Sequence, residues 1–190
     1  MIRIARGFYR NRWAAVSLFI LAVIVFGVLA AEVIAPASGE MIDLENSLKP
    51  PSISHPFGTD SFGRDLFTRV VHGSRISLSV GFVARTISLL IGMVLGVISG
   101  FYGGRLDSVI MRLADITFAF PTLLLLVAIM AVVTPGMMTL FTVLGIVGWA
   151  AVARLVRAQV LAVREREYVQ AARSSGAGTL SLIIRHILPQ

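Results

Sequence analysis

Residues 167–189 read EYVQAARSSGAGTLSLIIRHILP, and this polar segment directly follows a hydrophobic stretch. Four of its residues recur at i, i+3, i+4 and i+7 and therefore share one face of a predicted helix: Tyr168, Ala171, Ala172 and Ser175. That face carries little bulk, as a helix needs if it is to seat in a cleft of another protein. Gly176 and Gly178 then predict the end of this helix.

A second short helix is predicted after the glycines. Thr179 is placed to cap its N-terminus, and Pro189 closes the segment. Its apolar residues form a stripe at helical spacing: Leu180, Ile183, Ile184 and Ile187. From the residues alone, an amphipathic hairpin lying at a membrane surface remains an alternative.

The composition indicates an integral membrane protein. Of the 190 residues, 56% are hydrophobic and 14% are charged, so a soluble domain of this length could not bury its apolar surface. The absence of cysteine excludes disulfides and thiolate chemistry. Although the net charge is +7, the basic residues lie mostly beside apolar stretches. We therefore interpret them as topogenic charge and predict no nucleic-acid partner.

Four stretches are long enough to cross a lipid bilayer, which needs about 20 apolar residues. They lie at 13–34, 76–101, 113–133 and 137–155. The apolar run of the first is longer than the h-region of a secretory signal, about 7–15 residues, so a retained anchor is predicted. The predicted fold class is an all-α, polytopic transmembrane helical bundle.

Arginines mark the predicted cytoplasmic ends of these spans. The positive-inside rule places residues 1–12, the 102–112 loop and the 156–190 segment inside, and the 35–75 loop outside. Four crossings from an inside start return the chain to the inside. The even number of spans and the arginine distribution therefore place the 156–190 segment on the same side. The arginines concerned are Arg3, Arg6, Arg10, Arg12, Arg105, Arg112, Arg154, Arg157, Arg164, Arg166, Arg173 and Arg185.

Two features of the spans predict how their helices pack. Ser88, Gly92, Gly96 and Gly100 recur every four residues, which allows a neighbouring helix of the same subunit to approach closely. Pro121 interrupts the third span and predicts a kink.

Arg85 and Asp115 are the ionisable residues deepest in the predicted spans. Such residues are candidates for lining a path or a gate. The alternative is that they reach the nearer interface. Asp115 lies three residues after Arg112, which predicts an ordinary interfacial ion pair.

The outside loop contains a candidate surface helix. Thr59 or Asp60 can cap a short helix that begins near Phe62. Its apolar side would be formed by Leu66, Phe67 and Val70, lying at the membrane before the second span.

The 167–189 segment resembles the EAA loop of the permease subunits of bacterial ABC importers. The pattern is Glu-Ala-Ala, three residues, Gly, nine residues, Ile, one residue and Leu-Pro. The matching residues are Ala171, Ala172, Gly176, Leu188 and Pro189. Gln170 stands in place of the Glu of the pattern, and His186 in place of its Ile. A glutamate lies three residues earlier, at Glu167. The resemblance implies that 164–189, with Tyr168, contacts a cytoplasmic ATPase, so that bulk at Ala172 or Gly176 would uncouple transport.

The outside loop resembles a signature of the dipeptide, oligopeptide and nickel importer permeases, and of the C-type member of each pair. The residues that match this signature are His55, Pro56, Phe57, Gly58, Thr59, Asp60, Gly63, Arg64 and Asp65. The sequence Arg75-Ile76-Ser77-Leu78 follows them. The resemblance implies docking of an extracytoplasmic binding protein at this loop. A structural plug that anchors the second span is the alternative.

The resemblance implies the bacterial cytoplasmic (inner) membrane, a second, B-type permease subunit and an ATPase that binds ATP and Mg. The chain itself lacks a P-loop, since its only lysine is Lys49, and its three histidines are isolated, so we predict no bound cofactor, no metal and no enzymatic role. Members of the family continue past the Leu-Pro with two further spans, so this chain is expected to be a shorter form or a piece. Nickel import and a non-transporting membrane scaffold remain alternatives to peptide import.

Overall fold

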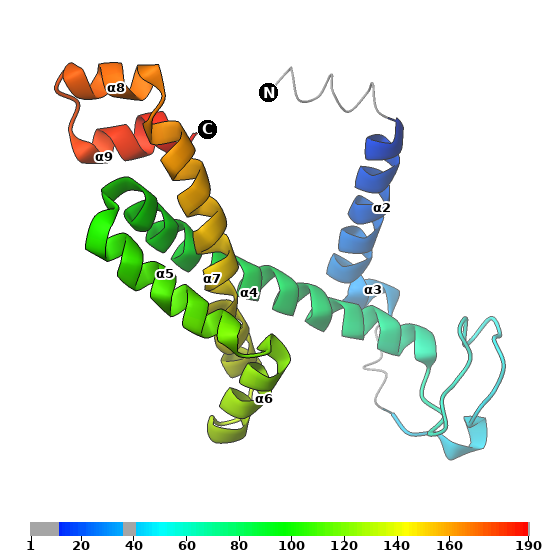
Figure 1. Cartoon of the computed structure of the whole chain (residues 1–190). Coiled ribbons are helices and arrows are strands. Elements are labelled where there is room, and N and C mark those ends of the chain that lie inside the picture. Colours follow the sequence, from blue (N-terminus) through cyan, green and yellow to red (C-terminus); the bar gives the residue numbers. More distant parts are fainter. Residues whose placement is uncertain (1–11, 36–40, 190) are drawn as a thin grey trace. The chain divides into compact units, whose positions relative to one another are not determined.

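The computed structural model describes residues 12–35 and 41–189, and these form two units that meet within one helix, at Ser79 and Val80. The predicted cytoplasmic N-terminus, apart from Arg12, lies outside the described residues. The described elements are helical, in agreement with the all-α prediction (Figure 1).

The first unit contains α2 (Arg12–Leu29), α3 (Ala31–Ile34), the short helix η1 (Leu44–Asn46) and the start of α4 (Leu66–Tyr102). No residue of α2 is buried, and the helix is apolar all round, as expected of a helix surrounded by lipid. The first predicted span, 13–34, is therefore divided: α2 ends at Leu29, and α3 follows as a separate turn.

The second unit contains the rest of α4 together with the remaining helices. These are α5 (Gly104–Ala119), α6 (Thr122–Val132), α7 (Met137–Arg164), α8 (Glu167–Ser174), α9 (Thr179–Ser181) and the π-helix η2 (Leu182–Ile187). Helix α7 packs against both α5 and α6.

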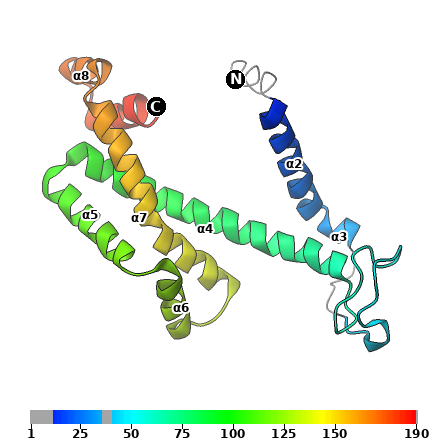
Figure 2. The same cartoon turned by 45° about the vertical axis from the view of Figure 1, so that its right-hand side comes forward.

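Three described helices are long and apolar enough to cross a membrane, namely α2, α4 and α7. Helices α5 and α6 would form a fourth span if counted together, but they are bent by 89°. Figures 1 and 2 show this bend from two sides. The break lies at Pro121 as predicted, although it is much sharper than a kink, and the 102–112 region predicted as a loop is largely the first part of α5.

Helix α4 corrects the prediction of a separate surface helix. It begins at Leu66 and continues without interruption to Tyr102, so Phe67 and Val70 belong to its first turns. Its N-terminus is capped by Asp65, whose Oδ2 accepts a hydrogen bond from the Thr68 amide at 2.8 Å. The predicted cap at Thr59 or Asp60 is therefore wrong.

The row of small residues on α4 meets α7, as predicted. A Cβ built on Gly96 would lie 2.6 Å from the carbonyl oxygen of Ala153, and one on Gly92 would lie 2.5 Å from the Cβ of Val152. The buried Ser88 hydroxyl donates to the Gly145 carbonyl at 2.9 Å. Two helix backbones can approach this closely only where side chains are absent or very small.

Candidate functional site

The 164–189 segment folds into a hairpin of two short helical arms. Helix α8 forms the first arm, and α9 with η2 forms the second. Gly176, at φ +83°, makes the turn between them in a conformation that favours glycine. Thr179 is the first residue of α9 and follows the N-cap Gly178, so its predicted capping role is wrong.

The hairpin is attached to α4 and α7 through a small apolar core. Val97 from α4, Val160 from α7 and Ile187 from η2 are buried together. Val169 of α8 and Leu182 of η2 are also buried, at 0% and 3% exposed. Apolar burial on both arms therefore holds the hairpin against the ends of two long helices.

The predicted apolar stripe of the second arm is divided by the π-helix. Ile187 is buried and Ile183 packs on the core, but Leu180 and Ile184 are 70% and 53% exposed. In η2 the Leu188 amide donates to the Ile183 carbonyl at 2.9 Å, an i→i+5 bond. The wider turn rotates later residues away from the positions expected at α-helical spacing.

Most of the predicted contact residues lie on the outside of the hairpin. Ala172 and His186 are half-buried. The others are exposed: Glu167, Tyr168, Gln170, Ala171, Gly176, Leu188 and Pro189. The Tyr168 hydroxyl donates to the His186 carbonyl at 3.3 Å, which links the two arms. Of the low-bulk face predicted from Tyr168, Ala171, Ala172 and Ser175, all but the half-buried Ala172 are exposed.

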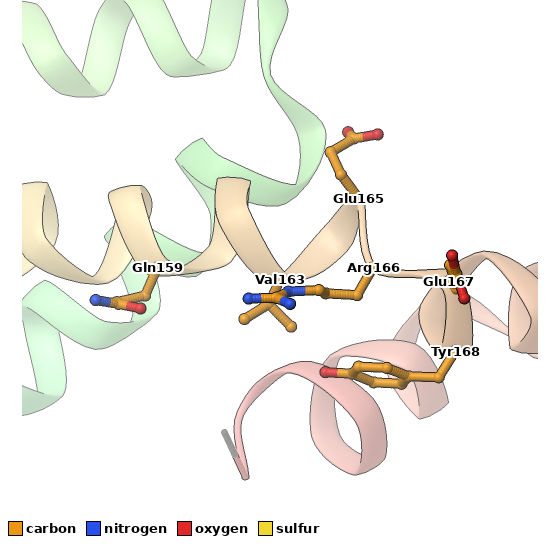
Figure 3. A pocket seen from close by; sticks show the side chains of 6 residues that line it. All are labelled: Gln159, Val163, Glu165, Arg166, Glu167 and Tyr168. Carbon is orange, nitrogen blue, oxygen red and sulfur yellow. The ribbon is translucent and has the colours of Figure 1, made fainter.

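A pocket of 780 Å³ lies where α7 turns into α8 (Figure 3). The Tyr168 ring lies over the second arm, while Arg166 extends toward Val163. The pocket is lined by Gln159, Val163, Glu165, Arg166, Glu167 and Tyr168. Its mixture of carboxylate, guanidinium and amide groups suits contact with a polar protein surface.

Three polar contacts that the sequence did not reveal fix the hairpin to the long helices. Arg164 donates from Nη1 to the Gly100 carbonyl at 2.9 Å, and Gln170 donates to the Arg164 carbonyl at 3.3 Å. The Arg173 guanidinium lies 5.7 Å from the centre of the Phe101 ring. The sequence indicates only topogenic charge for both arginines, because their partners lie far away in the chain.

The signature residues of the outside loop form hydrogen bonds and ion pairs mostly within the loop and the start of α4. Asp60 accepts hydrogen bonds from the amides of Phe62 and Arg64, from Arg64 Nε at 2.8 Å and from Arg69 at 2.7 Å. Burial disfavours the charged carboxylate, but the hydrogen bonds from Arg64 and the two amides outweigh it and lower the pKa of Asp60 to about 2.

The remaining signature residues hold the same loop closed. Thr59 is buried and accepts from the Lys49 amide at 2.8 Å, and His55 contacts Asp65 at 3.2 Å. Gly58 and Gly63 have φ of +74° and +71°, and a Cβ on Gly63 would collide with the backbone of Asp43. These residues therefore build a fixed loop, and a docking partner would meet its surface.

Replacing Asp60 with Asn is expected to open this loop, because the amide cannot neutralise Arg64 and Arg69. Hydrogen–deuterium exchange at the Phe62 and Arg64 amides should rise by at least tenfold at pH 7. The Asp43→Asn variant is the control, since the Asp43 carboxylate accepts a side-chain hydrogen bond only from Asn46 among the described residues. Equal exchange in both variants would contradict the role of Asp60.

The lowered pKa of Asp60 predicts how the stability of this loop depends on pH. A carboxylate whose folded pKa is depressed stabilises the fold above its ordinary value, near 3.8, and that stabilisation is lost as the pH falls toward 2. Exchange in the unsubstituted protein, corrected for its intrinsic pH dependence, should therefore rise between pH 4 and 2. A flat profile across that range would show that Asp60 does not hold the loop.

The two candidate path residues are not brought together. Asp115 pairs with Arg154 of α7 at 2.6 Å and not with Arg112, so the predicted pairing along the helix is wrong. Arg85 lines a separate pocket among α4, α6 and α7. Helix α5 presents Asp115 toward α7, and this arrangement could not be seen in the spacing of α5 alone.

A second ion pair, which the sequence does not indicate, joins three helices. Asp107 of α5 accepts from Arg157 of α7 at 2.5 and 2.6 Å and from the buried Ser99 hydroxyl of α4 at 2.5 Å. The sequence predicts a loop at Asp107 and only topogenic charge at Arg157, so nothing in it joins the two residues.

The comparisons with known proteins agree with this architecture. Residues 92–190 match the family described as binding-protein-dependent transport system inner membrane component. Residues 1–51 match the N-terminal TM domain of oligopeptide transport permease C.

Relatives with similar sequences are permease proteins of transport systems. The chain is 42% identical over 182 residues to the oligopeptide transport system permease protein OppC of Bacillus subtilis (strain 168), covering 96% of this chain and 60% of the relative. It is 39% identical to the dipeptide transport system permease protein DppC of the same organism, covering 95% and 56%. It is 37% identical to the glutathione transport system permease protein GsiD of Pectobacterium atrosepticum, covering 97% and 62%.

The chain thus spans about 60% of the length of these relatives. The family match covers the last part of α4 and the helices from α5 to the hairpin, and the resemblance deduced from the 55–75 and 167–189 motifs is confirmed. The several apolar helices identify a multi-pass membrane protein. The chain belongs to the family of binding-protein-dependent transport system inner membrane components.

Proposed function

We propose that this chain is the permease part of an ATP-driven importer of short peptides in the bacterial cytoplasmic (inner) membrane. It would form part of the translocation path together with a second, B-type permease subunit. The names of its relatives support this substrate class, since they include oligopeptide and dipeptide transport permeases.

In this proposal the hairpin of residues 164–189 contacts a cytoplasmic ATPase. The attachment of the hairpin to two long helices supports this contact. Arg164 donates a hydrogen bond to the Gly100 carbonyl of α4, and the hairpin shares a core with Val97 and Val160. A push on its exposed face would therefore move two long helices together and alternate access to the path. ATP and Mg would be bound by that partner.

The outside loop would receive an extracytoplasmic substrate-binding protein. Because Asp60, Arg64 and the two glycines fix the loop, it offers a surface that changes little on binding. Large apolar side chains stand out from it, including Leu48, Ile53 and Phe57. Exposed apolar groups on a fixed backbone suit a protein contact.

Two glycine variants test the contact with the ATPase. Gly176→Asp places a side chain at φ +83°, where L-residues are strained by about 1–2 kcal/mol. The turn, and with it the direction of α8, should change. We expect at least fivefold less ATPase to copurify with this variant when the chain is co-expressed with the ATPase and partner permease.

Gly178→Asp is the matched control. Gly178 is also exposed, and nothing lies within 4 Å of a Cβ at either glycine, but its φ of −65° is allowed for every residue. This variant should retain the ATPase. Equal retention by Gly176→Asp and the unsubstituted chain would contradict the role of the turn, and absence of the ATPase from all three would contradict the coupling proposal.

A further inference from the structure

Arg85 lies in the middle of a long apolar helix and has no partner for its charge among residues 12–35 and 41–189. It lies about 15 Å along α4 from Arg75 and about 26 Å from the end at Tyr102, at 1.5 Å per residue. In the part of the chain that the structure describes, Arg85 makes no ion pair or hydrogen bond. A charge at this depth is costly unless it meets water or an opposite charge.

The acidic residues of the second unit do not supply that charge. Asp107 is bound by Arg157, Asp115 by Arg154, and Glu165 by Arg164. Glu167 lines the pocket at the hairpin. The counter-charge of Arg85 is therefore to be sought outside the described residues of the second unit.

Arg85 lines a pocket of 260 Å³ among α4, α6 and α7. Of the two nearby hydroxyls, that of Ser88 already donates to Gly145, whereas Thr122 Oγ1 has no hydrogen-bond partner among the described residues. The apolar part of the lining includes Leu126, Leu144 and Val147. The pocket thus combines one guanidinium and one hydroxyl with an apolar wall.

The chemistry of this pocket matches a carboxylate attached to a small apolar group. A guanidinium can hold both carboxylate oxygens through two parallel N–H donors, and Thr122 can add a third. Whole drug-sized ligands occupy about 300–1,000 Å³, so this smaller pocket fits one end of a peptide. An apolar last side chain would lie against Leu126 and Leu144.

We propose that this pocket binds the C-terminal carboxylate of the transported peptide, and that the Arg85 guanidinium pairs with its negative charge. The inference rests on the proposed function as a peptide importer. It assigns a binding site on this chain and a preference for peptides with a free C-terminus.

The test uses the assembled transporter in proteoliposomes, with its binding protein and ATP. Uptake of radiolabelled trialanine is compared with uptake of trialanine amide, which lacks the negative charge. The measured quantity is the ratio of acid to amide uptake. Because the same binding protein is present throughout, its own preference cancels when a variant is compared with the unsubstituted transporter.

In Arg85→Gln the ratio is expected to fall by about tenfold, since the acid loses a charged hydrogen-bond pair whereas the amide loses only a weaker hydrogen bond to its carbonyl oxygen. Arg85→Lys keeps the charge and should retain most of the ratio. Arg105→Gln removes an exposed arginine outside this pocket and should leave the ratio unchanged. ATP hydrolysis stimulated by the binding protein verifies assembly. If Arg85→Gln fails to assemble, Thr122→Val decides, because it removes the proposed third donor and should lower the ratio whereas Arg105→Gln should not.

Equal loss of acid and amide uptake in Arg85→Gln would overturn the proposal, because Arg85 would then pair with an acidic group of the protein assembly. An unchanged ratio in Arg85→Gln would also overturn it. Failure of the unsubstituted transporter to import either peptide is a different result, since it would refute the peptide-import function itself.

Discussion

Replacing Gly96 with alanine is expected to lower the free energy of unfolding by about 1–3 kcal/mol, the usual range for overpacking a tight core. The added methyl group would lie 2.6 Å from the Ala153 carbonyl oxygen and 2.8 Å from the Cβ of Val156. The first neighbour is backbone, so α7 as a whole must move away from α4. Thermal unfolding in detergent should show a clear drop in the midpoint temperature.

Gly73→Ala provides the control for this prediction. Gly73 belongs to the same helix, but nothing lies within 4 Å of a Cβ at this position. Alanine is the better helix former by up to about 1 kcal/mol, so this variant should be neutral or slightly more stable. If both alanine variants melted at the same temperature, the close approach of α4 and α7 at Gly96 would not be a source of stability.

The glycine row shows which kind of structural prediction the sequence supports well. A spacing of four residues places side chains on one helix face whatever the helix packs against, so the close contact was predictable. The glycine turn of the hairpin follows in the same way, since Gly176 and its neighbours are local in the chain. Patterns of this kind depend only on backbone geometry.

Helix α5 shows why the ends of the helices could not be predicted from hydropathy alone. Hydropathy measures the transfer of side chains into lipid, and the charges of Arg105, Asp107 and Arg112 lowered it below the level of a span. Charge does not end a helix, however, and each of these residues is compatible with helix formation. Helix α7 extends to Arg164, beyond the predicted end at residue 155, for the same reason.

The partners of the charged residues could not be predicted because they are set by tertiary packing. Asp115 has Arg112 one turn away, yet it pairs with Arg154, thirty-nine positions along the chain. The exposure of Ile184 depends likewise on the π-helical turn, which no periodicity indicates. For the candidate site, the sequence identified the hairpin and most of its outward residues, whereas its attachment to Gly100 and Phe101 required the structure.

The Asp107→Asn variant is expected to lower the free energy of unfolding by about 2–3 kcal/mol. Removing one partner of an ion pair withdrawn from solvent leaves the other charge uncompensated, which costs about 3–5 kcal/mol when burial is complete. Here Arg157 is 31% exposed and Asp107 is 20% exposed, so a smaller value is expected. Chemical denaturation in detergent, followed by near-ultraviolet circular dichroism, measures the difference.

A double-mutant cycle separates the ion pair from other effects of the substitution. Arg157→Gln added to Asp107→Asn removes the uncompensated charge, so the double variant should be more stable than Asp107→Asn alone. Glu165→Gln is the exposed control: its partner Arg164 lies 3.0 Å away and Glu165 is 65% exposed, so its effect should stay within about 0.5 kcal/mol. Strictly additive losses in the cycle would mean that Asp107 and Arg157 contribute independently. A positive coupling would instead mean that the two charges stabilise each other across α5 and α7.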